Sequence, residues 1–432
     1  MSLDRLEAEL GSIEPGADPY RWAFAAYRVA VARSETARSE DDVAGALGLL
    51  DRASRILTPT RSPVEYARVI TAAANCHRQL SAPQRAAALF EEAADLLADR
   101  VAATEHAAAL TNLGLARIEL GTPERAVEPL TRAIDQITSH DDEARRVRGA
   151  ALLNRAQAHQ ASRTEASLLT AIDDYRRAVA DFDSEAPQRG MALHGLGAAI
   201  LELLRMASSG TAAAGAPTID DALDSFRASL RILTIDGFPF QHALAQHSLG
   251  IAYERQAAPF DLARALHCVE MSMSIFDPRL HKLQWQTAAD ALARIESGLA
   301  GGGSAPRITY VVRLLVGTSE NERCSILRER LRRLSSGPAE RTRREIAGLA
   351  GALVELSIDE YLVAVRSLVP VLMELPEPVL DAACAALCAA HQVTDAQEDF
   401  DGALDAVVHE LLHGPQRVRV RDMLEQHGWV RP

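Results

Sequence analysis

The sequence predicts an all-α protein, in which a solenoid of stacked helical hairpins is followed by a smaller C-terminal helical domain. Composition is the first reason: 48% of the 432 residues are hydrophobic, only 4% are aromatic, and Ala and Leu dominate. These two residues lose little conformational freedom in a helix. The second reason is that apolar residues recur at spacings of three and four, in a pattern that returns after roughly 40 residues.

The first helix of each expected hairpin carries a small residue at one fixed place. A small side chain lets the backbone of a neighbouring helix approach closely. The helices are expected at 108–120, 150–162, 192–204 and 243–255, with Gly114, Ala156, Gly197 and Gly250 as their small residues.

The second helix of each hairpin carries a small, a large and a small residue at spacings of four and three. Examples are Ala126, Leu130 and Ala133, and weaker versions of the pattern occur earlier in the chain. These spacings place all three residues on one helical face. The second helices are expected at 123–137, 168–182, 219–233 and 262–276, with earlier ones around Phe90 and Leu50.

This pattern resembles the tetratricopeptide repeat (TPR). The best match lies in residues 107–140, and the resemblance extends over about 19–296 as six repeats and a terminal helix. It implies a right-handed α-solenoid of TPR-like hairpins, whose first helices line a concave groove for an extended peptide or a partner helix. The long-period repeats also look like bacterial arrays attached to caspase-like protease domains. The matching residues are Leu110, Leu113, Gly114, Ala126, Leu130 and Ala133.

Glycine-rich segments suggest where the chain divides. The stretch 298–307 holds four glycines, a serine and a proline, which is typical of a linker. Residues 307–317 could form a helix or a strand, because their β-branched run fits both. The Gly, Ser, Ala and Pro residues of 206–217 predict a flexible insertion at the surface. The expected parts are an N-terminal segment 1–18, the repeat domain 19–297, the linker 298–306 and a C-terminal helical domain 307–432.

Charge and cysteine usage exclude several classes of protein. A net charge of −13 argues against a nucleic-acid binder, which needs a positive surface. No apolar run reaches the length of a membrane span. Five scattered cysteines and the lack of a signal peptide favour reduced thiols in the cytoplasm. The arginine-rich stretch 323–344 is interleaved with glutamates and fits a solvated helix face, or alternatively a contact to nucleic acid or an acidic protein.

Polar residues on the first helices are the candidate binding residues. Asn112 and Asn154 occupy equivalent positions, and Asn75 falls one turn later in the preceding repeat. His194 and His247 extend this line in the next two repeats. A carboxamide both donates and accepts hydrogen bonds, so it can hold a peptide backbone whatever the peptide's side chains are. The alternative is that these residues cap turns or pair with neighbouring helices.

Two motifs suggest metal chemistry as an alternative. His409, Glu410 and His413 form an HExxH motif, which binds zinc in hydrolases when both histidines share one helical face. The apolar face of this segment lies opposite both histidines, and Pro415 ends the helix soon afterwards. We therefore assign no catalytic residue, no metal site and no cofactor.

The segment 384–391 offers a second set of candidate ligands, Cys384, Cys388 and His391. Cysteine also behaves as a small hydrophobic residue where helices pack closely, and this simpler interpretation is preferred.

The sequence thus predicts a non-enzymatic scaffold or regulatory adaptor that binds a protein or peptide in the concave groove. The C-terminal domain would supply a second contact or a homo-oligomer interface. One alternative is a zinc-dependent hydrolase that uses the HExxH motif. Another is a structural accessory subunit whose groove is filled by its own C-terminal helices.

Overall fold

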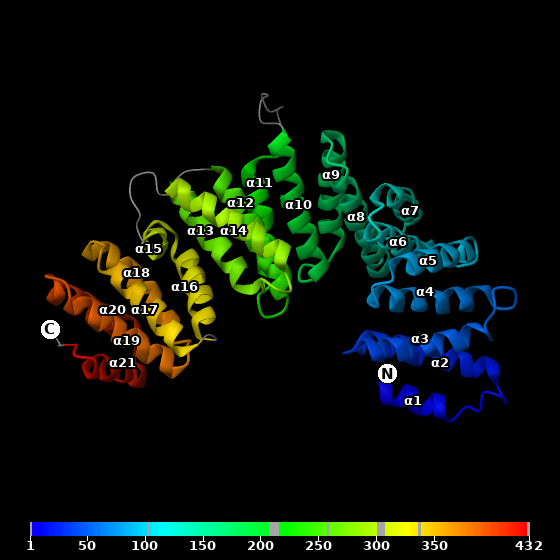
Figure 1. Cartoon of the computed structure of the whole chain (residues 1–432), viewed down its shortest axis with the longest axis horizontal. Helices are drawn as coiled ribbons and strands as arrows, with labels where there is room; N and C mark the ends of the chain where they lie inside the picture. The colour runs from blue at the N-terminus through cyan, green and yellow to red at the C-terminus, as the bar shows by residue number, and fades with distance from the viewer. Residues whose placement is uncertain are drawn as a thin grey trace. The chain divides into compact units, whose positions relative to one another are not determined.

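The computed structural model describes residues 2–101, 103–206, 216–256, 259–299, 307–335 and 338–429. These residues form 21 helices and no strand, which confirms the predicted all-α class. The chain divides into two compact units, residues 1–233 and residues 234–432, which are considered separately below. Figure 1 labels their helices in chain order. Most of the insertion predicted at 206–217 and of the linker predicted at 298–306 lies outside the described residues.

The first unit consists of one leading helix and five helical hairpins, α2/α3 to α10/α11. Every hairpin that the repeats predict in this unit is present. The helices are α1 (Leu3–Gly11), α2 (Pro19–Thr36), α3 (Glu40–Ser54), α4 (Pro63–Gln79), α5 (Pro83–Leu97), α6 (Ala103–Glu119), α7 (Pro123–Gln136), α8 (Asp142–Ala161), α9 (Glu165–Asp181), α10 (Pro187–Met206) and α11 (Ile219–Ile232).

Local sequence signals explain where these helices begin. Proline is the first residue of α2, α4, α5, α7 and α10, a position that needs no backbone N–H and suits its fixed φ angle. Capping boxes start α3, α9 and α11. At α11, for example, Thr218 accepts a hydrogen bond from the backbone of Asp221, whose side chain accepts one in return.

The small residues allow close contact within each hairpin, as predicted. A methyl group placed on Gly114 would lie 2.4 Å from Cγ of Leu130, which is fully buried. At Gly197 the added methyl group would lie 2.7 Å from the ring of Phe226, which is also fully buried. In these two hairpins the bulky side chain of the second helix therefore occupies the space that a glycine of the first helix leaves.

The first helices of the hairpins form the inner layer of this unit. Helix α2 packs on α4, α6 on α8, and α8 on α10, while α4 and α6 are joined by ion pairs. In the described part of residues 1–233, no second helix packs closely on the next second helix. A stack of hairpins is closest together on its inner side, so the first helices present the surface where a groove is expected.

The second unit begins with the sixth predicted hairpin, α12/α13, and the expected additional helix α14 packs on α13. The remaining helices form two layers: α15, α17, α19 and α21 follow one another in one layer, and α16, α18 and α20 in the other. The helices are α12 (Pro239–Gln256), α13 (Pro259–Ile275), α14 (Lys282–Leu299), α15 (Arg307–Gly317), α16 (Glu320–Ser335), α17 (Ala339–Leu353), α18 (Ile358–Leu372), α19 (Glu377–Gln392), α20 (Gln397–Leu411) and α21 (Gly414–Gln426).

The ambiguous segment 307–317 is the helix α15 rather than a strand. Its β-branched Val311 and Val312 are buried together with Leu314 and Leu315, and such burial outweighs a weak intrinsic preference for strands.

Candidate peptide-binding surface

Partly exposed side chains form a stripe along each inner helix of the first unit. On α6 the stripe contains Ala108, Asn112 and Leu115, and the positions between them are buried. We call the stripes of α2, α4, α6, α8 and α10 together the inner strip. The stripe of α2 holds Tyr27 and Val31, so the inner strip starts in the first hairpin.

The three predicted asparagines lie on three successive inner helices, and two of them, Asn75 and Asn112, belong to the inner strip. Asn75 and Asn112 are half-buried, and Asn154 is 8% exposed. Within the described residues, none of the three carboxamides takes part in a side-chain hydrogen bond. The alternative that they cap turns or pair with neighbouring helices therefore finds no support there. The donors and acceptors of Asn75 and Asn112 are available to a ligand, whereas most of the Asn154 side chain is covered.

Two ion pairs fix the relative position of α4 and α6 on either side of Asn75 and Asn112. Arg68 donates two hydrogen bonds to Glu105, of 2.7 and 3.0 Å. Arg78 donates two to Glu119, of 2.6 and 2.8 Å. Such bidentate contacts are geometrically specific, so they hold α4 and α6 in register on either side of the two asparagines.

The two predicted histidines occupy a different register. His194 stands three residues before the small residue Gly197, whereas Asn112 stands only two residues before Gly114. The His194 ring packs against Phe226, with ring centroids 5.8 Å apart.

His247 stands likewise three residues before Gly250 and belongs to the second unit. Its Nδ1 is buried without a partner in the described structure, and burial lowers the pKa of this histidine. The three asparagines therefore lie on successive inner helices of one unit, whereas His194 has a different register on α10 and His247 belongs to the other unit.

An open pocket of about 400 Å³ lies on the inner strip between α2 and α4. Asn75 was predicted as a site residue, but the wall that α2 contributes was not, because the first repeat is too degenerate to assign its exposed face. The residues that line the pocket are Val31, Ser34, Glu35, Ala72, Asn75, Arg78 and Gln79.

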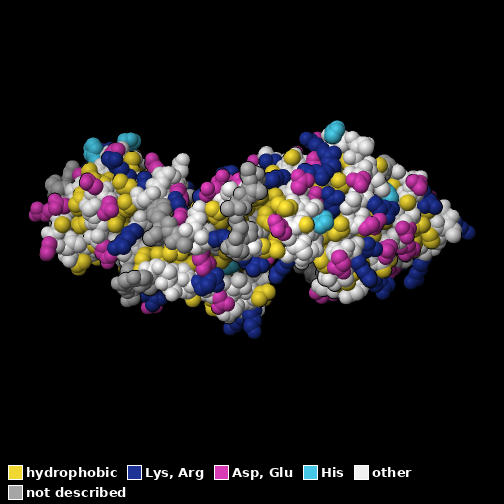
Figure 2. Space-filling view, turned by 90° about the horizontal axis from the view of Figure 1, so that it is seen from above, with side chains coloured by type: hydrophobic (Ala, Val, Ile, Leu, Met, Phe, Trp, Pro, Cys, Tyr) yellow, Lys and Arg dark blue, Asp and Glu magenta, His cyan; other side chains and the backbone are white. Residues whose placement is uncertain are grey.

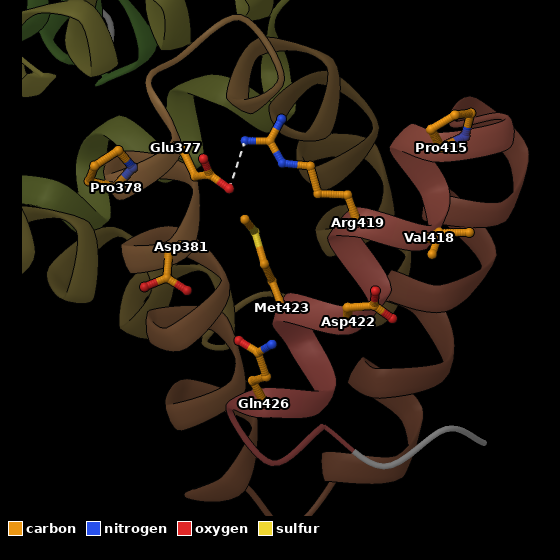
Figure 3. Close-up of a pocket in the computed structure, with 9 residues that line it drawn as sticks. All are labelled: Glu377, Pro378, Asp381, Pro415, Val418, Arg419, Asp422, Met423 and Gln426. Carbon is orange, nitrogen blue, oxygen red and sulfur yellow. Dashed lines mark ion pairs between the residues drawn. The ribbon is translucent and has the colours of Figure 1, made fainter.

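A second hollow, of about 940 Å³, lies between α19 and α21 in the second unit (Figure 3). Met423 extends into the space between the two helices, and Arg419 reaches across to Glu377 at 3.4 Å. Asp381 contacts His427 at 2.9 Å. The charged groups of this hollow thus include both signs and are mostly paired, so they specify no ligand.

The HExxH segment lacks the geometry of a zinc site. Helix α20 ends at Leu411, so His409 lies in its last turn while His413 precedes α21. All three motif residues are exposed, and Glu410 pairs with Arg366 at 2.8 Å. No group of three potential metal ligands comes together anywhere in the described residues. The hydrolase alternative therefore has no structural support.

Cys384, Cys388 and His391 lie in the core rather than in a metal site. Burial raises the pKa of Cys384 to about 12 and that of Cys388 to about 11, so both remain thiols at neutral pH. The His391 ring contacts Asp401 at 2.7 Å and the Tyr361 hydroxyl at 2.8 Å. A carboxylate only accepts, so Nδ1 carries the proton and Nε2 accepts from the tyrosine. The interpretation as packing residues agrees with this arrangement.

The arginine-rich stretch is used largely in contacts within the second unit. Arg328 pairs with Glu374 and Arg341 with Glu345. Arg323 donates to Ser367 and to backbone carbonyls. On the face drawn in Figure 2, acidic and basic side chains are interleaved. No helix of the described residues has the length and hydropathy of a membrane span.

Known families, curated proteins and solved structures give different outcomes for this chain. The sequence matches no known protein family and none of the curated proteins. Among solved structures, a kinesin light chain of Podospora anserina with TPR-like repeats is 19% identical; the match covers 56% of this chain and 97% of that one, with a TM-score of 0.36. YrrB, described as a TPR protein with an unusual peptide-binding site, is 19% identical over 52% of this chain and 91% of its own, with a TM-score of 0.32.

A signal-transduction ATPase of Pyrococcus horikoshii with a TPR sensor is 14% identical, and the match covers 95% of this chain. This chain spans only 53% of that protein, and the TM-score is 0.40. All three TM-scores lie below 0.5, so these likenesses carry no conclusion about this chain. The TPR-like architecture expected from the sequence is present in the paired helices themselves, with a glycine facing a larger side chain in α6/α7, α10/α11 and α12/α13.

Proposed function

We propose that this protein is an adaptor that binds an extended segment of a partner protein along the inner strip of residues 1–233. The observation that carries the proposal is the set of carboxamides of Asn75, Asn112 and Asn154. They lie on three successive inner helices and form no side-chain hydrogen bonds within the described structure.

Carboxamides suit a ligand whose side chains vary. Each can donate to a peptide carbonyl and accept from a peptide N–H, which all peptides offer. Packed helices lie about 8–10 Å apart, and an extended peptide advances about 3.3 Å per residue. Asparagines on neighbouring inner helices would therefore meet a bound peptide about once every three residues. One such hydrogen bond contributes about 0.5–1.5 kcal/mol net.

A display library of random peptides, selected on the whole protein, tests this proposal. For a selected peptide, the Asn112→Ala, Asn154→Ala double variant should bind about 10- to 100-fold more weakly, because two hydrogen bonds are lost. Its melting temperature should fall only slightly, because neither side chain forms a hydrogen bond within the described structure and only the buried Asn154 loses packing. Fluorescence anisotropy gives the dissociation constant, and circular dichroism gives the melting temperature.

Gln84→Ala is the matched control, because Gln84 is an exposed amide on the outer helix α5. It should leave peptide binding unchanged. Failure to select any peptide, or a folded double variant with the affinity of the unchanged protein, would overturn the proposal.

A structural accessory role is the second candidate, and one observation favours it. Within the second unit, Gln246 of the inner helix α12 donates to Glu329 of α16 at 3.3 Å, so a C-terminal helix already contacts one repeat helix. If the groove is filled by the protein's own C-terminal helices, the whole protein should select no peptide. The same peptide library therefore distinguishes the adaptor from the structural accessory subunit. Homo-oligomerisation through 307–432 and a cytoplasmic location remain predictions.

A further inference from the structure

The pocket between α2 and α4 indicates one feature of the partner. We propose that it receives a basic side chain, arginine or lysine, of the peptide bound on the inner strip. This inference rests on the proposed function and adds to it the chemical character of one peptide position.

The backbone around the pocket favours a positive charge. All of its lining residues lie in the C-terminal halves of two helices, Val31 to Glu35 in α2 and Ala72 to Gln79 in α4. These two helices pack side by side. The last turn of a helix carries the negative end of the helix dipole, and this remains so although some of its carbonyls accept hydrogen bonds here, as Ser34 does from Gln79 at 3.3 Å. Two such ends therefore face the same pocket.

Glu35 adds a full negative charge that nothing in the described structure balances. It is exposed and forms no ion pair with any described residue. It also lies in the last turn of α2, where the helix dipole disfavours a carboxylate. The neighbouring Arg33 does not compensate for it, because Arg33 pairs with Glu7 of α1 at 2.7 Å. A bound cation would supply the missing partner.

The one basic residue of the pocket lining is already neutralised. Both hydrogen-bonding nitrogens of Arg78 point to the carboxylate of Glu119, at 2.6 and 2.8 Å. Glu35 therefore dominates the local charge. The same charge disfavours a peptide's C-terminal carboxylate, which agrees with the lack of lysines in the repeats: the only lysine of the chain is Lys282.

The rest of the lining suits a long basic side chain. Val31 and Ala72 offer an apolar wall for the methylene groups, which arginine and lysine bury readily. Asn75 and Ser34 provide acceptor oxygens for the N–H groups at the end of the chain. Because Asn75 belongs to both the pocket and the line of asparagines, a peptide held by the strip can also fill the pocket.

A double-mutant cycle tests this inference. Peptides selected on the whole protein from a random library should share an arginine or lysine at one position. One such arginine peptide is synthesised again with citrulline, a neutral analogue of the same shape, and both peptides are titrated into the unchanged protein and the Glu35→Gln variant. We expect citrulline to weaken binding by the unchanged protein about tenfold, and to have little effect on the variant.

Glu40→Gln is the control, since Glu40 is an exposed carboxylate on the outer helix α3. It should preserve the preference for arginine. The melting temperature of Glu35→Gln should match or exceed that of the unchanged protein, because an unfavourable charge at a helix end is removed.

The possible failures can be told apart. If selected peptides depend on Asn112 and Asn154 but show no shared basic residue, the pocket inference is wrong and the adaptor proposal stands. Equal loss from citrulline in the unchanged protein and in Glu35→Gln would also overturn the inference. If no peptide is selected at all, the proposed function itself fails.

Discussion

At the scale of single residues, Gly197 shows how one missing side chain determines the packing of a hairpin. Its neighbour Phe226 is fully buried, and the ring lies where a β-carbon of residue 197 would project. Gly114 and Leu130 repeat this relation two hairpins earlier in the chain. Densely packed interiors have little free volume, so the ring cannot move aside without disturbing its other contacts.

Gly197→Ala should therefore destabilise the protein. The added methyl group would lie 2.7 Å from the Phe226 ring, so the two helices must separate or the ring must shift. Overpacking of this kind costs about 1–3 kcal/mol. Urea unfolding followed by circular dichroism measures the change in the free energy of unfolding.

Gly48→Ala is the matched control. Gly48 lies in the middle of α3, is exposed, and has no atom within 4 Å of an added β-carbon. Alanine is the better helix former by about 1 kcal/mol, so this variant should be as stable as the unchanged protein or slightly more stable. Equal effects of the two substitutions would contradict the packing argument.

Single residues also show where the sequence stops being informative. The line of Asn112 and Asn154 could be predicted, because helical periodicity determines which positions share a face. The pocket beside Glu35 could not, because it forms only when α2 and α4 pack together. The HExxH spacing was ambiguous for a related reason: Pro415 signals a helix end, but only the structure shows that the end falls at Leu411.

At the scale of helices, the sequence predicted the positions of the helices well but the contacts between them poorly. Proline and capping residues act within a few positions of the chain, so helix starts are encoded locally. The contacts between helices are not. Arg155 of α8 illustrates this, because it donates two hydrogen bonds to Asp174 of α9 and one to Thr131 of α7, and so ties three helices together.

Arg155→Leu should be strongly destabilising. The Asp174 side chain is 1% exposed, and without Arg155 it would keep only Arg177 at 3.6 Å. Removing one partner of a buried ion pair costs about 3–5 kcal/mol, and the remaining contact to Arg177 favours the lower end of this range. The free energy of unfolding in urea gives the value.

Arg145→Leu provides the comparison on the same helix. Arg145 pairs with Asp142 three residues away, and the Asp142 side chain is 83% exposed. Exposed pairs contribute about 0–1 kcal/mol, so this loss should be small. If the two arginine variants lost similar stability, burial of Asp174 would not be the cause.

At the scale of the whole molecule, the glycine content of the sequence and the contacts between helices place the boundary between domains at different positions. The glycines of 298–306 suggest a boundary, yet helices on either side of that segment pack together within residues 234–432. Arg264 of α13 pairs with Glu322 of α16, and Glu270 of α13 with Arg330. Glycine content reports local chain flexibility, whereas these contacts join positions about 60 residues apart, a relation that a single sequence does not reveal.

Fragments of the chain discriminate between the two divisions. A fragment of residues 1–306 would retain α13 but lose α15 and α16. Glu270, whose side chain is only 15% exposed, would lose Arg330. The face of α13 that packs on α15 and α16, where Val311 and Leu327 are buried, would be exposed to water. Exposed apolar patches promote association, so we expect 1–306 to bind a hydrophobic dye and to elute as an aggregate in size-exclusion chromatography.

The fragment 234–432 is the control, because it keeps every one of these contacts and should be helical and unfold cooperatively. Soluble fragments 1–306 and 307–432, with helical signals that add up to that of the whole chain, would contradict this expectation. They would also favour the boundary predicted from the glycines, since each part would then fold without the other.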